Sequence, residues 1–174
     1  MTKKTIFVIL PHFGGGGAER STLNLINNWI NKNYEIYLIL MSKEGELISY
    51  LDKKIHVIDL KCKRIIHTII PCFKLFKKYR PDITLVLMWP LTSVILVSWL
   101  LSLKVGKLFV ADHNPFTNSW FEDFKINKII FYIIYNLTYT FATGIICVSK
   151  NVKSQIKNFL IFNKKKIYQI NNSI

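Results

Sequence analysis

The stretch TIFVILPHFGGGGAERSTLNL, residues 5–25, decides the fold. An apolar run over Thr5–Leu10 is followed by four glycines, Gly14–Gly17, and then by a helical pattern that begins at Ala18. This order predicts a strand, a tight turn and the N-terminus of a helix. Such a turn brings backbone N–H groups and the positive end of a helix dipole to one point, which suits a phosphate or another anion.

Two familiar phosphate-binding loops do not fit these glycines. The dinucleotide fingerprint needs glycine at its first, third and sixth positions, but the sixth position is Glu19 when counted from Gly14 and Arg20 when counted from Gly15. The nucleotide-triphosphate loop needs Gly-Lys-Ser/Thr at its end, and no Lys follows the glycines. A structural alternative is that the glycines only supply positive φ for a sharp turn, although four in a row exceed what a turn requires.

Apolar runs and helical patterns alternate along the rest of the chain. The expected strands are 5–10, 35–41, 55–59, 82–88, 107–111, 144–148 and 166–170, and the expected helices are 18–31, 46–51, 66–79, 91–103, 123–141 and 150–159. This alternation predicts an α/β fold, a Rossmann-like doubly wound and mainly parallel sheet with helices on both faces. Strands that are apolar throughout, such as 6–10 and 83–88, are expected to be covered on both sides.

Length and composition indicate one domain with a sizeable core, because the chain has 174 residues of which 51% are hydrophobic. The formal charge of +14 points to anionic partners. A nucleic-acid partner is not expected, because no nucleic-acid-binding motif is present and the lysines alternate with large apolar blocks; an anionic membrane surface fits better. Three widely spaced cysteines, Cys62, Cys72 and Cys147, support neither a disulfide framework nor a zinc site and indicate a reducing cytosol.

Two uncharged stretches, 83–103 and 129–149, are long enough to cross a membrane. The first contains a short β-branched run followed by Trp89-Pro90, which predicts a strand, a turn and a helix instead. The second is interrupted by polar residues and by Gly144, and it ends in another β-like block. We therefore expect neither stretch to be a spanning helix, and no secretory signal is visible at the N-terminus.

Polar residues follow several of the expected strands. They are His12–Gly17, the run Asp112-His113-Asn114-Pro115, Ser149, and Asn171-Asn172. Because ligands of open α/β sheets bind outside the carboxyl ends of the strands, this edge is the expected site. His113 and Asn114 are candidates for substrate contact, and His12 is either a cleft residue or a turn residue. Ser149 is expected to cap the helix that begins at Lys150, and His56 and His67 are expected to be structural.

Five segments together resemble the N-terminal domain of a GT-B glycosyltransferase of the large retaining family 4. They are IFVILPHFGGGGAERSTLNL from Ile6, RPDITLVLMWP from Arg80, VADHNPF from Val110, ATGIICVSKNVKSQI from Ala142, and IYQINNSI from Ile167. Their order and spacing over the whole chain make the set specific, although each is weak alone.

The resemblance implies transfer of a sugar from a nucleotide-sugar to an acceptor with retention at the anomeric carbon, without a metal or other cofactor. It implies that Gly15, Gly16 and Gly17 approach the donor diphosphate with their backbone N–H groups, where they stabilise the leaving nucleotide. It places His113 near the transferred sugar as the catalytic candidate. Glu19 opens the following helix, where it either contacts substrate or only suits the helix dipole.

The resemblance also implies a second domain that holds the nucleotide-sugar, and this domain is absent from the sequence. Residues 1–174 are therefore expected to be the acceptor-side domain alone, which would not catalyse transfer by itself. The chain is a fragment, the product of a disrupted gene, or a non-catalytic membrane-associated subunit of a split glycosyltransferase. A nucleotide-binding domain of another function is a further alternative.

Basic and aromatic residues indicate contact with a membrane or with a lipid-linked acceptor. The residues are Lys74, Lys77 and Lys78 in one expected helix, and Phe116, Trp120 and Phe121 after His113. They predict a cytoplasmic protein at the inner face of the cell membrane, and the resemblance to family 4 implies that it serves polysaccharide or glycolipid assembly. A solvated basic surface beside a buried aromatic loop is the alternative.

Overall fold

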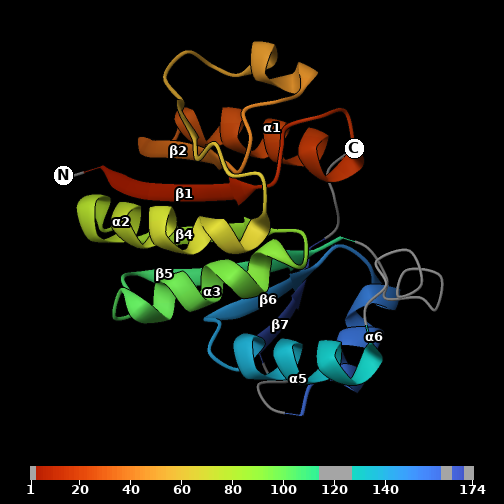
Figure 1. Cartoon of the computed structure of the whole chain (residues 1–174). Coiled ribbons are helices and arrows are strands. Elements are labelled where there is room, and N and C mark those ends of the chain that lie inside the picture. Colours follow the sequence, from red (N-terminus) through yellow and green to blue (C-terminus); the bar gives the residue numbers. More distant parts are fainter. Residues whose placement is uncertain (1–2, 114–126, 162–165, 171–174) are drawn as a thin grey trace.

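Seven parallel strands form one sheet in the order β3-β2-β1-β4-β5-β6-β7 (Figure 1). This arrangement comes from a computed structural model, which describes residues 3–113, 127–161 and 166–170. The strands are β1 (Lys4–Leu10), β2 (Tyr34–Leu40), β3 (His56–Asp59), β4 (Ile83–Leu87), β5 (Lys107–Asp112), β6 (Gly144–Cys147) and β7 (Ile167–Gln169). The Rossmann-like parallel sheet predicted from the sequence is confirmed, with each strand within a residue or two of its expected bounds.

The helices that connect the strands also match the expected pattern. They are α1 (Gly17–Ile30), η1 (Glu46–Tyr50), η2 (Ile65–Thr68), α2 (Ile69–Tyr79), α3 (Leu91–Leu101), α5 (Lys128–Tyr139) and α6 (Lys150–Phe159). The two long uncharged stretches resolve into β4 with α3 and into α5 with β6. Over the described ranges, we find no helix that combines the length and the apolar character needed to cross a membrane.

The core has two parts, one on each face of the sheet. Helices α2, α3, α5 and α6 supply the buried side chains of one part, and α1 and η1 supply those of the other. This division follows from right-handed crossovers. The chain moves from β1 to β3 in one direction across the sheet and from β4 to β7 in the other, so the two sets of helices lie on opposite faces.

The strands 6–10 and 83–88 are both buried, but in different ways. Strand β1 lies between helices on both faces, and its residues from Ile6 to Leu10 are almost fully buried. On the α1 face, Leu85 and Leu87 of β4 lie in a groove of about 400 Å³, which Leu25 and Trp29 of α1 border. The groove continues over β5 and β6, because the crossovers from β4 onward all pass over the other face.

Candidate functional site

The glycine turn follows β1 at the carboxyl edge of the sheet and is open to solvent. Gly15, Gly16 and Gly17 are exposed, and Gly16 caps α1 in an extended conformation with φ −69° and ψ 162°. The N–H groups of Gly15 and Gly16 have no hydrogen-bond partner among the described residues, and the first N–H groups of a helix have no partner within it. The turn therefore offers backbone donors at the positive end of the α1 dipole.

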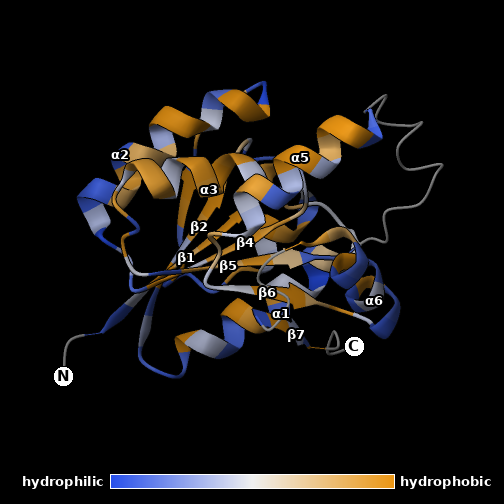
Figure 2. Ribbon diagram, turned by 90° about the horizontal axis from the view of Figure 1, so that it is seen from below, coloured by the Kyte–Doolittle hydropathy of each residue, from blue (hydrophilic) through white to orange (hydrophobic). Residues whose placement is uncertain are grey.

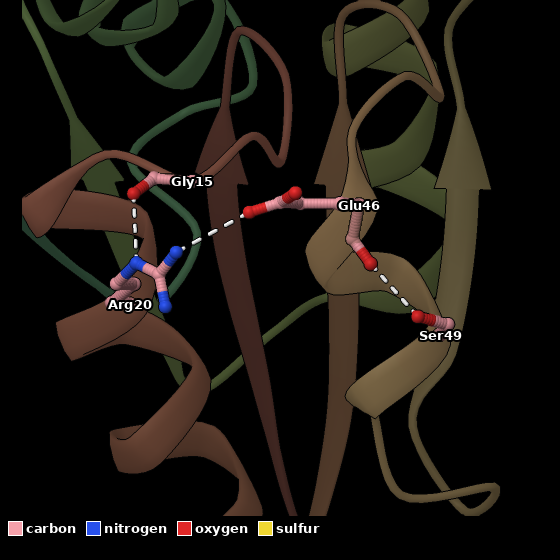
Figure 3. A network of polar contacts seen from close by, with 4 residues as sticks. All are labelled: Gly15, Arg20, Glu46 and Ser49. Atoms are coloured by element: carbon pink, nitrogen blue, oxygen red, sulfur yellow. Dashed lines mark hydrogen bonds and ion pairs between the residues drawn. The ribbon is translucent and has the colours of Figure 1, made fainter.

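Contacts from the segment after β2 hold this turn in place. The N–H of Phe13 donates to the carbonyl oxygen of Glu44 at 2.8 Å, and the N–H of Leu47 donates to that of Phe13 at 3.3 Å. Figure 3 shows Arg20 between the turn and η1: its Nε donates to the carbonyl oxygen of Gly15 at 2.8 Å, and its guanidinium lies 3.3 Å from Glu46 Oε1. The turn is thus fixed before any ligand binds.

Positive φ does not explain the glycines of the turn, and lack of space for a Cβ applies to Gly15 and Gly16. Among the described residues, the glycines with positive φ are Gly45 and Gly106. A Cβ on Gly15 would lie 2.6 Å from Glu46 Oε1, and a Cβ on Gly16 would collide with the Glu19 carboxylate. A Cβ on Gly17 would meet nothing within 4 Å. The alternative in which the glycines only supply positive φ is therefore wrong.

Glu19 and His12 meet beside the turn. Glu19 lies in the first turn of α1 with 4% of its surface exposed, and its Oε1 is 3.5 Å from His12 Nδ1. His12 itself is exposed. The pair therefore borders the glycine turn with a buried carboxylate and an accessible imidazole.

His113 follows β5 at the same edge of the sheet. Its Nδ1 is buried and has no hydrogen-bond partner among the described residues. Burial lowers the pKa of the imidazole, so His113 is neutral at pH 7. Its side chain lines the groove together with Thr22 of α1, which leaves a neutral ring with a free nitrogen close to the first turns of α1.

Asp112 directly precedes His113 and is the most deeply buried acid of the site, with 2% of its surface exposed. Tyr135 donates to its Oδ2 at 2.8 Å and Tyr139 to its Oδ1 at 3.0 Å, and Thr92 is 2.7 Å from the Tyr139 hydroxyl. Burial raises the pKa of Asp112 to about 6, while the hydrogen bonds from both tyrosines act to lower it. This network ties α3 and α5 to the strand end that carries His113.

The glycine turn and His113 are neighbours along the edge but do not touch. Strand β4 lies between β1 and β5, and strands are spaced about 4.8 Å apart, so the two strand ends are about 10 Å apart. The groove lining includes Ser21, Thr22 and His113, but not the glycines. The arrangement can accommodate an extended ligand with an anionic group at the turn and a neutral group at His113.

The other candidate residues from the sequence lie at a helix cap, on α2 or outside the described residues. Ser149 accepts a hydrogen bond from the Val152 N–H at 3.2 Å, which confirms it as a helix cap. Asn114, Phe116, Trp120 and Phe121 lie outside the described residues. Lys74, Lys77 and Lys78 are exposed on α2, which runs back toward the start of β4, so Lys77 and Lys78 lie at the edge opposite the site. Their expected contacts stay predictions.

Gly45 shapes the site and was not among the residues expected from the sequence. Gly45 has φ 124°, and a Cβ there would collide with the backbone of Phe13; its position before an acidic helix start was the available signal. Among the described residues, no cluster of three or more His, Cys, Asp or Glu side chains has the arrangement of a metal site.

The family is shown by comparison with known sequences. A model of glycosyltransferase family 4 matches residues 15–174, which is nearly the whole chain. The chain belongs to glycosyltransferase family 4. No curated protein sequence is similar enough to count as a match.

Solved structures of the same fold include a glycosyltransferase from Rickettsia africae ESF-5, with 23% identity and a TM-score of 0.73 over 98% of this chain and 43% of the other. The apo form of the lipopolysaccharide outer core galactosyltransferase WaaB has 18% identity and a TM-score of 0.66 over 98% of this chain and 46% of the other. The Anabaena protein Alr3699/HepE in complex with UDP has 12% identity and a TM-score of 0.66, with coverages of 98% and 44%. The chain thus has the fold of one GT-B half and spans less than half the length of these proteins.

Proposed function

We propose that this chain is the acceptor-side half of a retaining glycosyltransferase. The complete enzyme moves a sugar from a nucleotide-sugar to a cell-surface polysaccharide or to a lipid-linked acceptor. The observation that carries the proposal is the open glycine turn at the start of α1, whose N–H groups at the carboxyl edge of a parallel sheet have no partner among the described residues. Membership of family 4 and the UDP bound to the Anabaena protein of the same fold support a nucleotide donor.

In the proposed mechanism, the N–H groups of Gly15, Gly16 and Gly17 donate to the diphosphate as negative charge develops on the leaving nucleotide. Donors that are fixed before the reaction stabilise such charge most effectively, because no reorganisation is needed. The hydrogen bonds of Arg20 and Phe13 hold the glycine turn in place before the reaction. No metal takes part in this proposal.

His113 contacts the transferred sugar in this proposal. A neutral imidazole whose buried Nδ1 has no partner within the described ranges can donate to or accept from a hydroxyl group without the cost of burying a charge. Asn114 is proposed to contact the same sugar, and His12 and Glu19 are proposed to bind substrate beside the glycines. The remaining nucleotide contacts come from a second domain, so the chain alone is proposed to be inactive.

We place the enzyme in the cytoplasm, at the inner face of the cell membrane, where a lipid-linked acceptor is available. The test of the function is release of nucleotide and transfer of labelled sugar by the chain combined with a donor-binding domain, in one polypeptide or as a second subunit. Transfer that requires this chain and is lost when Gly15 and Gly16 become Val supports the proposal. Transfer that survives the double substitution contradicts it.

A further inference from the structure

Helix α5 carries large apolar side chains on its outer face. Five of them, Ile129, Ile130, Ile133, Ile134 and Leu137, together with Phe141 just beyond the end of the helix, are between 42% and 70% exposed, and we call these six residues the α5 patch. The inner face of the same helix places Phe131, Tyr135 and Tyr139 in the core. A helix that is apolar all round is ordinarily buried all round, so the α5 patch calls for an apolar partner.

The surroundings of the patch are basic. Residues 60–174 hold 17 Lys and Arg against 4 Asp and Glu, whereas residues 1–59 hold 7 against 6. No Asp or Glu occurs over 83–111 or over 124–174. Helices α2, α3 and α5 lie side by side on one face of the sheet (Figures 1 and 2), and this layer carries no acidic side chain over its described residues. The excess of positive charge therefore belongs to residues 60–174, the part of the sequence that contains these three helices.

A basic rim adjoins the end of the patch. Lys104 Nζ lies 5.1 Å from the centre of the Phe141 ring. Lys104 also lines a hollow of about 330 Å³ together with Lys77 and Arg80. Asp82 is the acid in this hollow, and its Oδ2 accepts a hydrogen bond from the Thr5 N–H at 2.8 Å. We call Lys77, Arg80 and Lys104 the basic rim; Lys77 lies in the last turn of α2, Arg80 caps that helix, and Lys104 follows α3 and contacts Phe141 of the α5 patch.

We infer that the α5 patch lies on an anionic lipid surface and that the basic rim binds the phosphate groups of its lipids. The apolar area of a helix determines how strongly it inserts into the lipid surface, and nearby lysines make it prefer anionic lipids. Helix α5 has 12 residues and is about 18 Å long, against about 30 Å for the hydrocarbon core, so it lies along the surface. A protein partner is less favoured, because it would have to match both the patch and a wide basic surrounding.

This orientation rests on the proposed function, and it adds which face of the chain contacts the membrane. Helix α5 begins at the carboxyl edge of the sheet and its inner face holds Asp112, the neighbour of His113. One face of the helix therefore meets the lipid while the other fixes the strand end of the candidate site. A lipid-linked acceptor reaches His113 from the membrane plane without leaving it.

The test is binding of the 174-residue chain to lipid vesicles, which needs neither donor nor acceptor. Vesicles of phosphatidylcholine alone are compared with vesicles that also contain about 30% phosphatidylglycerol, at low and at physiological salt. We expect sedimentation with the anionic vesicles and a loss of binding of at least about tenfold in Ile133→Gln/Leu137→Gln. Lys77→Gln/Lys104→Gln is expected to lose the preference for anionic lipid.

Matched controls lie on the other side of the sheet. Tyr50→Gln removes an exposed apolar side chain from η1 and Lys32→Gln/Lys53→Gln removes the same charge as the rim variant, and both are expected to bind as the original chain does. A second readout avoids polar substitution of the helix. The three native cysteines are buried, so a polarity-sensitive dye on Leu137→Cys should shift to the blue with anionic vesicles, and the same dye on Tyr50→Cys should not.

The vesicle experiments test the α5 patch independently of the proposed function. Vesicle binding that is unchanged in the α5 variants, or no binding at low salt, overturns the inference. A chain that ignores vesicles but forms a dimer in sedimentation equilibrium, lost in Ile133→Gln/Leu137→Gln, also overturns it and assigns the patch to a second copy. None of these results bears on sugar transfer, which fails or succeeds in its own assay.

Discussion

The buried carboxylate of Asp112 predicts an unusual dependence of stability on pH. Burial raises its pKa from 3.8 to about 6 in the folded chain. The folded state thus binds the proton more tightly than the unfolded state. The contribution of Asp112 to the free energy of unfolding is therefore highest below about pH 4, falls as the pH rises to about 6 and is level above that. Because one pKa unit corresponds to about 1.4 kcal/mol, the total fall is about 3 kcal/mol.

Asp112→Asn isolates this effect because the amide does not titrate. The substitution also weakens the hydrogen bonds from Tyr135 and Tyr139, at a cost of about 1–3 kcal/mol that does not change with pH. Urea unfolding of both proteins at several values between pH 3 and pH 8 gives the difference in their free energies of unfolding. This difference should move by about 3 kcal/mol in favour of the Asn variant as the pH rises.

Two results test whether the pKa of Asp112 is raised in the folded chain. Parallel curves for the two proteins would show that the pKa of Asp112 is not raised, and the buried network would then need another explanation. Tyr139→Phe removes a hydrogen-bond donor that lowers the pKa of Asp112. In this variant the free energy of unfolding should therefore fall over a range of higher pH than in the original chain. The pKa values of Tyr135, Tyr139 and Cys147 are all raised, so these groups titrate above the window. His113, whose pKa burial lowers, is present in both proteins, so the difference between their free energies of unfolding isolates Asp112.

Three further predictions concern the site. In the complete transferase, His113→Ala should lower the rate of transfer about 100-fold, because a preorganised polar contact is lost. A kinetic assay at saturating donor measures this rate, and an unchanged rate would show that His113 is not part of the site. Gly17→Ala should raise the free energy of unfolding of the chain by about 0.5–1 kcal/mol in urea, because its Cβ meets no atom within 4 Å and alanine favours the helix; a loss of stability would show that the turn is packed differently. Calorimetry should find that the isolated chain binds a nucleotide-sugar in about the millimolar range, and tight binding would contradict a second donor-binding domain.

The fold was predictable because its signals are local. The glycine turn and the alternating apolar runs each occupy short stretches, and a parallel sheet follows from their order alone. Strand ends and helix caps such as Ser149 could be read in the same way. The position of His113 at the site edge followed from the rule that ligands bind at the carboxyl ends of strands.

The contacts that shape the site were not predictable, because they join distant segments. Asp112 meets tyrosines 23 and 27 residues away, and Arg20 meets Glu46 from 26 residues away. Periodicity indicates that a helix has an apolar face, but in α5 both faces are apolar, so the sequence could not show which one packs on the sheet. The same lack of charge had made residues 129–149 resemble a membrane span.

The most direct test of the central claim is an amide NMR titration of the isotope-labelled chain with UDP at concentrations up to about the millimolar range. We predict that the N–H signals of Gly15, Gly16 and Gly17 shift most, together with smaller shifts at His12 and His113. Shifts confined to other parts of the chain, with the three glycine signals unmoved, would contradict the proposal that these N–H groups receive the diphosphate.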